Sequence, residues 1–173
     1  MEIRRLEPSD AASYRMLMLD AYRLYPDAFT ASVDEREPLP LSWWEARVKP
    51  GDDVVELVVG AFDDARLVGV AGLRFEQRPK ARHKALLIGM HVTASATGRG
   101  VGARLVREVL GIARRRDGVR VVQLTVSEGN APAQSLYERC GFVPFGVEPL
   151  AITSGDRYVA KVHMWTDLEA TDA

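Results

Sequence analysis

The sequence predicts a mixed α/β protein in which a mostly antiparallel sheet is flanked by helices. Apolar residues make up 47% of the 173 residues and charged residues 27%, which is typical of a chain that fills a core. The expected elements run strand, two helices, three strands, helix, strand, helix and two strands. That order contains only one strand–loop–helix–strand unit, so a doubly wound sheet is not expected. The length suits a single domain over residues 1–173.

The first 50 residues are expected to hold one short strand and two helices. Leu17, Ala21 and Leu24 fall on one face of an apolar-periodic stretch, which predicts an amphipathic helix. The proline-rich stretch that follows is expected to form a loop, and Ser42 is expected to cap the second helix. These elements are a strand over 3–6, helices over 11–25 and 41–48, and the loop over 25–40.

The rest of the chain alternates between strands and helices. Two apolar runs joined by DDAR, residues 63–66, predict a hairpin. Apolar residues over 101–112 repeat with a period near 3.6, which predicts a helix running to about Arg116. A short helix over 131–140 is expected to end at Gly141 in a left-handed conformation. Strands are expected over 54–62, 67–75, 85–92 and 119–126, with a final pair over 142–152 and 157–168.

Charge and cysteine content exclude several classes of function. The chain has 23 basic and 24 acidic residues, so no positive excess points to nucleic acid and no basic amphipathic segment points to a membrane surface. The run Arg114–Arg116 is expected to mark a helix C-terminus. Cys140 is the only cysteine and the three histidines lie on separate segments, so neither a disulfide nor a metal site is expected. Without a signal core or a long apolar run, a cytoplasmic location is expected.

The stretch ATGRGVGARL, residues 96–105, places three glycines around Arg99 at the start of an expected helix. Such a loop leaves backbone amides uncovered and commonly holds a phosphate, and an arginine inside it argues against a purely structural loop. The pattern also fits the dinucleotide motif G-x-G-x-x-G/A, with Glu128 ending the next strand. A doubly wound sheet needs more βα units than the remaining residues supply. The loop lacks the Gly-Lys-Ser/Thr of a triphosphate site.

Two linked motifs resemble the GNAT superfamily of N-acetyltransferases. In that family a strand of the type MHV leads into a glycine loop written Q/R-x-x-G-x-G/A, and a later helix carries A-x-x-LY-x-x-x-GF. Here GMHVTASATGRGVGARL, residues 89–105, matches the first motif and NAPAQSLYERCGF, residues 130–142, matches the second. The resemblance covers residues 54–168, with Thr97 where the family usually has Gln or Arg. It implies a twisted, mostly antiparallel sheet of about seven strands, in which splayed strands form an acetyl-CoA cleft.

The resemblance implies that acetyl-CoA is the co-substrate. Amides and positive charge at a helix start would hold its pyrophosphate. The amides of its pantetheine arm would pair with a strand edge, where a bulge splays that strand from its neighbour. Asn130 would cap the short helix while touching the cofactor. The implied cofactor-binding residues are Met90, His91, Val92, Thr97, Gly98, Arg99, Gly100, Val101, Gly102, Ala103 and Asn130.

The resemblance further implies that an amine attacks the thioester directly. Tyr137 is placed by the motif as the proton donor to the leaving thiolate, with a role in core packing as its alternative. Family members often carry an acid or a histidine early on the strand over 85–92, where Leu86 and Ile88 here occupy the positions expected to face inward. No base is assigned: the candidates are Glu76, His91, Glu128 and water.

The acceptor amine is left open by the sequence. Aromatic side chains with one acid suit a small amine carrying apolar bulk: Tyr25, Asp27, Phe29, Trp43 and Trp44. For at least half of these residues, packing in the core of a helical lid is the expected alternative. The first hypothesis is an acetyltransferase acting on a primary amine of a small molecule or peptide. A dinucleotide-binding oxidoreductase is one alternative. A non-catalytic acyl-CoA sensor is another, favoured by the apolar Leu86 and Ile88 and by Thr97. A homodimer is also left open.

Overall fold

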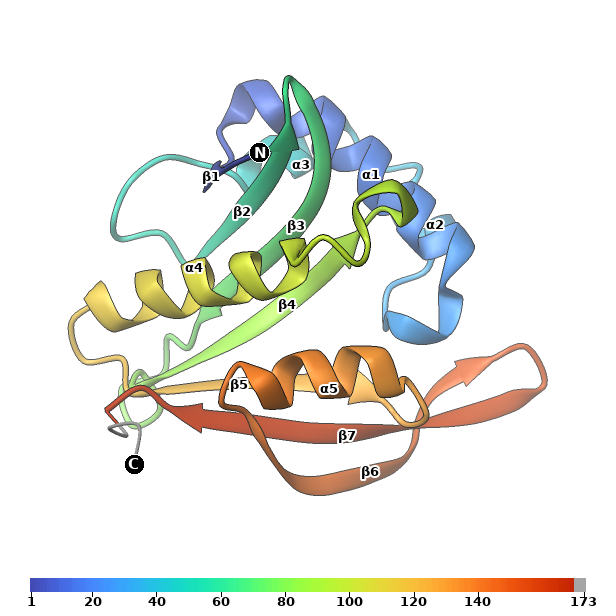
Figure 1. Ribbon diagram of the computed structural model, residues 1–173, viewed down its shortest axis with the longest axis vertical. Helices are drawn as coiled ribbons and strands as arrows, with labels where there is room; N and C mark the ends of the chain where they lie inside the picture. Colours follow the sequence, from blue (N-terminus) through green and yellow to red (C-terminus); the bar gives the residue numbers. More distant parts are fainter. Residues whose placement is uncertain (170–173) are drawn as a thin grey trace.

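The computed structural model describes residues 1–169 of the chain. Within them, seven strands form one sheet in the order β1-β2-β3-β4-β5-β7-β6 (Figure 1). Every neighbouring pair is antiparallel except β4 and β5, which are parallel. The predicted mostly antiparallel sheet is therefore confirmed. The strands are β1 Glu2–Arg5, β2 Glu56–Asp63, β3 Arg66–Phe75, β4 Lys84–Val92, β5 Val121–Ser127, β6 Val143–Ser154 and β7 Arg157–Asp167.

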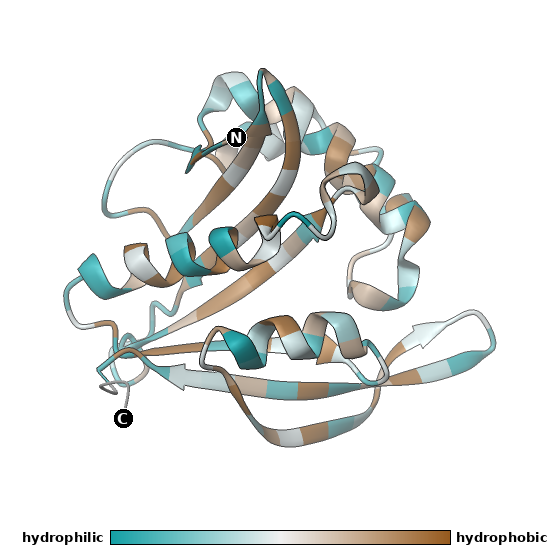
Figure 2. Ribbon diagram, viewed as in Figure 1, coloured by the Kyte–Doolittle hydropathy of each residue, from teal (hydrophilic) through white to brown (hydrophobic). Residues whose placement is uncertain are grey.

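Helices cover both faces of the sheet. Successive residues of a strand point to opposite faces, so Val59 of β2 packs in a core with α4 and α5, and Val58 packs in a second core with α1 and α3. Figure 2 shows apolar colour along β2, β3 and β4 between these layers. The helices are α1 Ala11–Leu24, α2 Val33–Arg36, α3 Leu41–Ala46, α4 Val101–Arg115 and α5 Ala131–Arg139.

The periodic stretches form the helices that their spacing predicts. Leu105 and Val109 of α4 are fully buried, and burying a side chain of this size contributes roughly 1.5–3 kcal/mol. The turn after α5 has Gly141 at φ +90°, the left-handed conformation expected there. The two predicted hairpins also form, as β2–β3 and β6–β7.

The stretch 25–40 differs from the expected loop, because it contains a 3₁₀ turn over Pro26–Ala28 and the helix α2. A capping box starts α2: the Ser32 hydroxyl accepts the Glu35 amide, and the Glu35 carboxylate accepts the Ser32 amide, each at 3.2 Å. The predicted cap at Ser42 is wrong, since the residue preceding α3 is Pro40 and no side chain caps that helix.

The parallel pair β4–β5 separates after three residues. Pairing runs only from Lys84 to Leu86, and the rest of the β5-facing edge of β4 has no strand partner among residues 1–169. Gly89 has φ +57° at a register shift between β3 and β4, which is a bulge requiring a left-handed residue. The two halves of the sheet diverge beyond this point (Figure 1). The bulge and splay that the resemblance implied are present.

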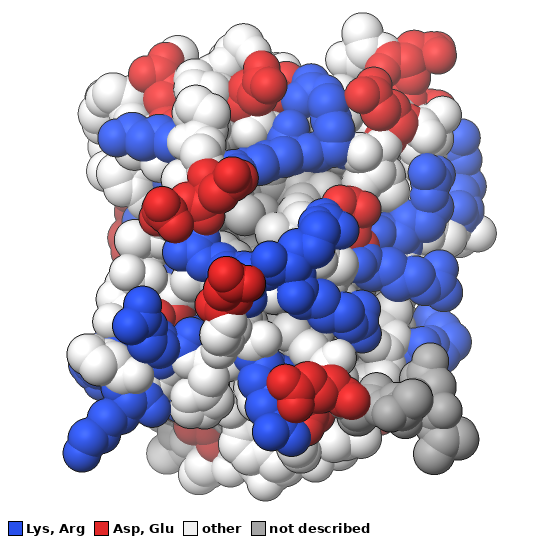
Figure 3. All heavy atoms as spheres, turned by 90° about the vertical axis from the view of Figure 1, so that its left-hand side faces the viewer, with Lys and Arg blue, Asp and Glu red and all other residues white. Residues whose placement is uncertain are grey.

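The surface near the end of α4 carries charges of both signs. Arg114 and Arg115 stand in the last turn of α4, as expected for a helix C-terminus. Figure 3 views this side of the molecule and shows Lys and Arg interspersed with Asp and Glu.

Among residues 1–169, no helix is long and apolar enough to cross a membrane.

Candidate active site

A cavity of about 710 Å³ opens between the diverging strands β4 and β5. Its walls are the free edge of β4, the loop and first turn of α4, the end of β5 and the start of α5. We call it the cofactor cavity. Every predicted cofactor-binding residue except Arg99 lines it: Met90, His91, Val92, Thr97, Gly98, Gly100, Val101, Gly102, Ala103 and Asn130.

The glycine loop gives the cofactor cavity an uncapped helix start. Gly98 and Gly100 have φ +79° and +74°, and a Cβ added at either meets nothing within 4 Å, so backbone conformation rather than crowding favours glycine there. A Cβ at Gly102 would lie 3.0 Å from Leu136 Cδ2, so this glycine lets α4 approach α5 closely. No side chain caps α4, and its first amides are therefore available to an anion.

Arg99 is turned away from the cofactor cavity. Its Nη1 donates to the Asp63 carboxylate at 2.8 Å, and this guanidinium holds the pKa of Asp63 below its usual range. A side-chain contact between Arg99 and phosphate therefore requires that ion pair to open.

The sequence interpretation missed Arg139, which stands in the last turn of α5 and lines the cofactor cavity. It lies inside the second motif, but nothing in its local pattern marks it as a phosphate ligand.

Asn130 begins α5 as predicted. Its Oδ1 accepts the Ala133 amide at 3.3 Å, which caps the helix beside the cofactor cavity. Its expected contact with the cofactor stays a prediction.

Thr97 offers a test of the departure from the family motif. Its hydroxyl is neutral, and Oγ1 donates to the Thr93 carbonyl at 3.1 Å. The exposed side chain therefore brings no charge to the cofactor cavity, where an arginine would bring one. Thr97→Arg should tighten coenzyme A binding about two- to fivefold, since an added exposed ion pair contributes modestly. Calorimetric titration at low and high salt should show the gain shrinking with salt. Thr97→Gln, which adds no charge, should lack that salt dependence. Weaker binding by Thr97→Arg would contradict the placement of this loop.

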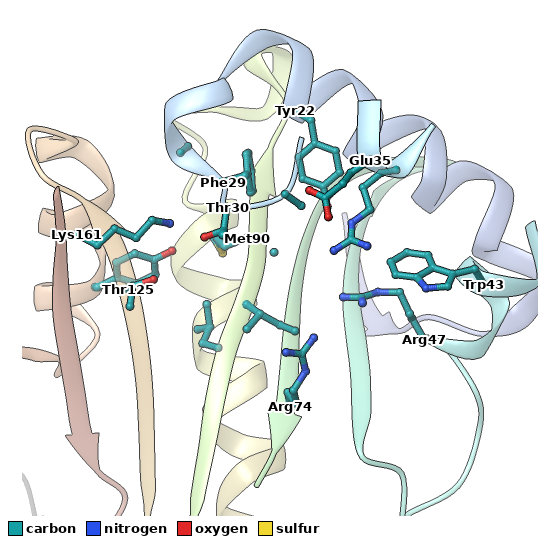
Figure 4. A pocket seen from close by; sticks show the side chains of 17 residues that line it. Tyr22, Phe29, Thr30, Glu35, Trp43, Arg47, Arg74, Met90, Thr125 and Lys161 are labelled. Carbon is teal, nitrogen blue, oxygen red and sulfur yellow. The ribbon is translucent and has the colours of Figure 1, made fainter. Parts of the chain in front are cut away.

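A second cavity of about 400 Å³ adjoins the first, and we call it the acceptor cavity. It is lined from the N-terminal helices, β3, β4, β5 and β7, and Figure 4 shows its side chains. The same five residues line both cavities: Ala28, Phe29, Met90, Thr125 and Tyr137. The two cavities therefore meet at these residues, which is where a group could pass from one bound molecule to another.

Tyr137 lies at this meeting point. Its ring packs edge-to-face on Phe142 with 5.9 Å between centroids, and the residue is only 6% exposed. Burial raises the pKa of Tyr137 well above its ordinary value, so the phenol is protonated at neutral pH. It can donate a proton or a hydrogen bond to an atom held where the cavities join.

None of the three candidate base residues lines the acceptor cavity. Glu76 and Glu128 line neither cavity, and His91 lines only the cofactor cavity. Burial lowers the pKa of His91, opposed by the Asp20 charge. Ile88 lines the acceptor cavity as an inward residue should, but the prediction that Leu86 faces inward is wrong: it is 40% exposed and lines neither cavity.

The predicted acceptor residues divide between the site and the core. Phe29 and Trp43 line the acceptor cavity, whereas Trp44 is fully buried and packs edge-to-face on its neighbours in the α1–α3 core. Tyr25 lines the cofactor cavity. Asp27 lines neither cavity and instead accepts two hydrogen bonds, from Ser154 Oγ to its Oδ1 and from Arg157 Nη2 to its Oδ2. These bonds tie the segment before α2 to the β6–β7 hairpin.

The charged lining of the acceptor cavity was missed by sequence reasoning. Lys161 of β7 is 6% exposed, and burial lowers the pKa of its amine below the usual range while Glu148 opposes the shift. The remaining charged side chains come from α2, the residue after α3, and β3, so only the fold brings them together. They are Glu35, Arg36, Arg47 and Arg74.

Comparison with known proteins identifies the family. The family model described as Acetyltransferase (GNAT) family matches residues 18–142. The chain is 28% identical over 163 residues to the L-amino acid N-acetyltransferase AaaT of Escherichia coli, covering 94% of each chain. It is 39% identical over 106 residues to the N-alpha-acetyltransferase RimI of Mycobacterium tuberculosis, covering 60% of this chain and 63% of that protein.

Solved structures share the fold. A GNAT-family acetyltransferase from Streptococcus pneumoniae superposes with a TM-score of 0.84 at 22% identity, covering 96% of this chain and 98% of that one. YncA of Salmonella typhimurium, a putative acetyltransferase solved with its cofactor acetyl-CoA, superposes with a TM-score of 0.80 at 22% identity, covering 100% of this chain and 96% of that one. The family match, the splayed β4–β5 pair and the glycine loop lead to one conclusion: this chain belongs to the GNAT acetyltransferase family.

Proposed function

We propose that the protein transfers the acetyl group of acetyl-CoA to the primary amine of a small molecule or peptide, by direct attack within a ternary complex. The observation that carries this proposal is the meeting of two cavities at Met90, Thr125 and Tyr137. One cavity has the uncapped helix start that suits a pyrophosphate, and the adjoining cavity has room for an acceptor. Support also comes from relatives named as N-acetyltransferases and from the Salmonella typhimurium structure with acetyl-CoA.

The chain's own groups fit acetyl-CoA. The amides that begin α4 face the cofactor cavity and would hold the pyrophosphate, with Arg139 adding positive charge. The free edge of β4 at Met90–Val92 offers backbone groups to an extended amide-bearing arm, as an added strand would use them. When bound, acetyl-CoA supplies a thioester that a neutral amine can attack. A backbone amide of β4 would stabilise the charge that develops on the carbonyl oxygen.

Tyr137 would supply the proton that the departing thiolate needs, and the resulting phenolate would regain a proton from water. Its raised pKa keeps the phenol protonated, and its place between the cavities brings it to both bound molecules. The amine of Lys161 lines the acceptor cavity with Tyr137, and in its protonated form it would favour negative charge at this point.

The acceptor's own proton would pass to water. Glu76, His91 and Glu128 do not line the acceptor cavity, and the Glu35 carboxylate that does line it accepts the Ser32 amide in the capping box of α2. The acid limb of kcat/KM should therefore follow the pKa of the acceptor amine. Activity should rise with pH until the amine is neutral. The measurement is kcat/KM against pH for two acceptors whose amine pKa values differ. The same acid-limb inflection for both acceptors would indicate a side-chain base instead.

Direct transfer is tested by initial rates with both substrates varied. A ternary complex predicts intersecting lines in double-reciprocal plots. Cys140, the chain's one thiol, lines neither cavity, and burial raises the pKa of its thiol, so it is a poor acyl carrier. Parallel lines, or an acetyl group found on Cys140 by mass spectrometry, would overturn direct transfer.

A further inference from the structure

We infer that the acceptor amine also carries an anionic group, such as a carboxylate or a phosphate, which Arg36 and Arg47 hold in the acceptor cavity. The inference rests on the proposed function, because it takes this cavity to be the place of the acceptor. In Figure 4, Arg47 and Trp43 lie on the opposite side of the cavity from Thr125 and Lys161. The anion would therefore bind away from the point where the two cavities meet.

The lining of the acceptor cavity has an excess of positive charge. Four basic side chains line it, Arg36, Arg47, Arg74 and Lys161, against one carboxylate, that of Glu35. Behind the lining, the single carboxylate of Glu56 serves two guanidiniums: it pairs with Arg47 and accepts from Arg74 Nε at 3.0 Å. A cavity with this balance attracts an acceptor that brings negative charge of its own.

Two guanidiniums share one aromatic ring in this cavity. Arg36 Cζ lies 4.7 Å and Arg47 Cζ 4.8 Å from the centre of the Trp43 ring, within the range of cation–π contact. The ring orients both groups but does not neutralise them. Both guanidiniums therefore keep their positive charge beside this ring, and an anion bound in the cavity would be attracted by each of them.

Of the three arginines that line the acceptor cavity, Arg36 is the one without a carboxylate partner in the described part of the chain. Among residues 1–169 it forms no salt bridge, whereas Arg47 and Arg74 both pair with Glu56. Within these residues, Arg36 therefore brings a charge without a salt-bridge partner to the lining of the acceptor cavity. A carboxylate or a phosphate offers several acceptors to a guanidinium fork and would pair with this charge.

The same charges select against other acceptors. A polyamine would bring further positive charges next to Arg36 and Arg47, and an uncharged amine would leave the excess positive charge of the lining unpaired. The preferred acceptor is therefore a small molecule with an amine at one end and an anion at the other.

The test compares matched amines that differ only in the anion. L-methionine is paired with L-methionine amide, 4-aminobutyrate with butylamine, and phosphoethanolamine with ethanolamine, with rates expressed per neutral amine. In at least one pair the anionic member should have kcat/KM at least tenfold higher, through a lower KM, and the advantage should fall with added salt. The first two pairs report a carboxylate at two spacings, and the third reports a phosphate.

Arg36→Gln assigns the preference to a residue. It should raise KM for the favoured anionic acceptor at least tenfold and raise KM for its uncharged partner far less. Arg36→Lys should keep part of the preference. The matched control is Arg23→Gln, because Arg23 is exposed on α1, pairs with Asp20 and Glu37, and lines neither cavity. It should change neither substrate's KM.

The outcomes separate the inference from the proposed function. If acetyl transfer occurs but uncharged amines match their anionic partners, the inference is overturned and the proposed function stands. An equal effect of Arg36→Gln on both members of a pair also overturns the inference. If acetyl-CoA binds and no amine is acetylated, the proposed function itself fails.

Discussion

Tyr137→Phe should lower kcat by about 10- to 100-fold while KM for acetyl-CoA changes little. The phenol hydrogen bond strengthens only as the carbon–sulfur bond breaks, so its loss affects the transition state more than the bound cofactor. Phenylalanine keeps the ring and its edge-to-face contact with Phe142, so the free energy of unfolding should change little. The measurement is kcat from single-turnover reactions, which isolate the chemical step.

Tyr158→Phe is the matched control for loss of a hydroxyl. Tyr158 lies on β7, is 61% exposed and lines neither cavity, so its variant should keep full activity. Equal single-turnover rates for Tyr137→Phe and the parent would assign Tyr137 to the core alone.

Gly100→Asp should weaken coenzyme A binding at least tenfold, a loss of about 1.4 kcal/mol or more. The substitution places a negative charge at the uncapped start of α4, where the pyrophosphate is expected. Aspartate tolerates a left-handed backbone better than most residues, and a Cβ at Gly100 meets nothing within 4 Å, so the fold should survive. Gly102 is a poorer site for this test, because a side chain there would collide with Leu136.

Two variants separate charge from backbone strain in this experiment. Gly118→Asp is the matched control: Gly118 has φ +80°, an added Cβ meets nothing within 4 Å, and the residue lines neither cavity. It should bind coenzyme A like the parent. Gly100→Asn, which lacks the charge, should weaken binding less than Gly100→Asp. If Gly100→Asp is folded and binds with parental affinity, the loop has only a structural role.

The cofactor cavity could be predicted because its residues are contiguous in two motifs. The strand 84–92, the glycine loop and α5 each carry a local signal, and the splay of β4 follows from a bulge at Gly89. The side-chain direction of Arg99 could not be predicted, since its partner Asp63 ends a strand far away in the sequence.

The acceptor cavity could not be predicted because its charged residues share no local pattern. Arg36, Arg74 and Lys161 come from a short helix, β3 and β7, and only the sheet order and the helix packing bring them to one place. The capping box that starts α2 has the sequence signature S-x-x-E at Ser32 and Glu35. The prolines on either side of it nevertheless favoured a loop over a helix in the sequence interpretation.

The most direct test of acetyl transfer is the release of free thiol from acetyl-CoA, followed with and without an amine. The assay uses the purified full chain and quantifies the acetylated amine by mass spectrometry in the same samples. Transfer predicts thiol release that depends on the amine, saturates with it, and equals the acetylated product mole for mole. Tight binding of acetyl-CoA with no amine-dependent thiol release across the matched amines and a panel of N-terminal peptides would contradict it, and would leave a protein that binds acyl-CoA without catalysing transfer.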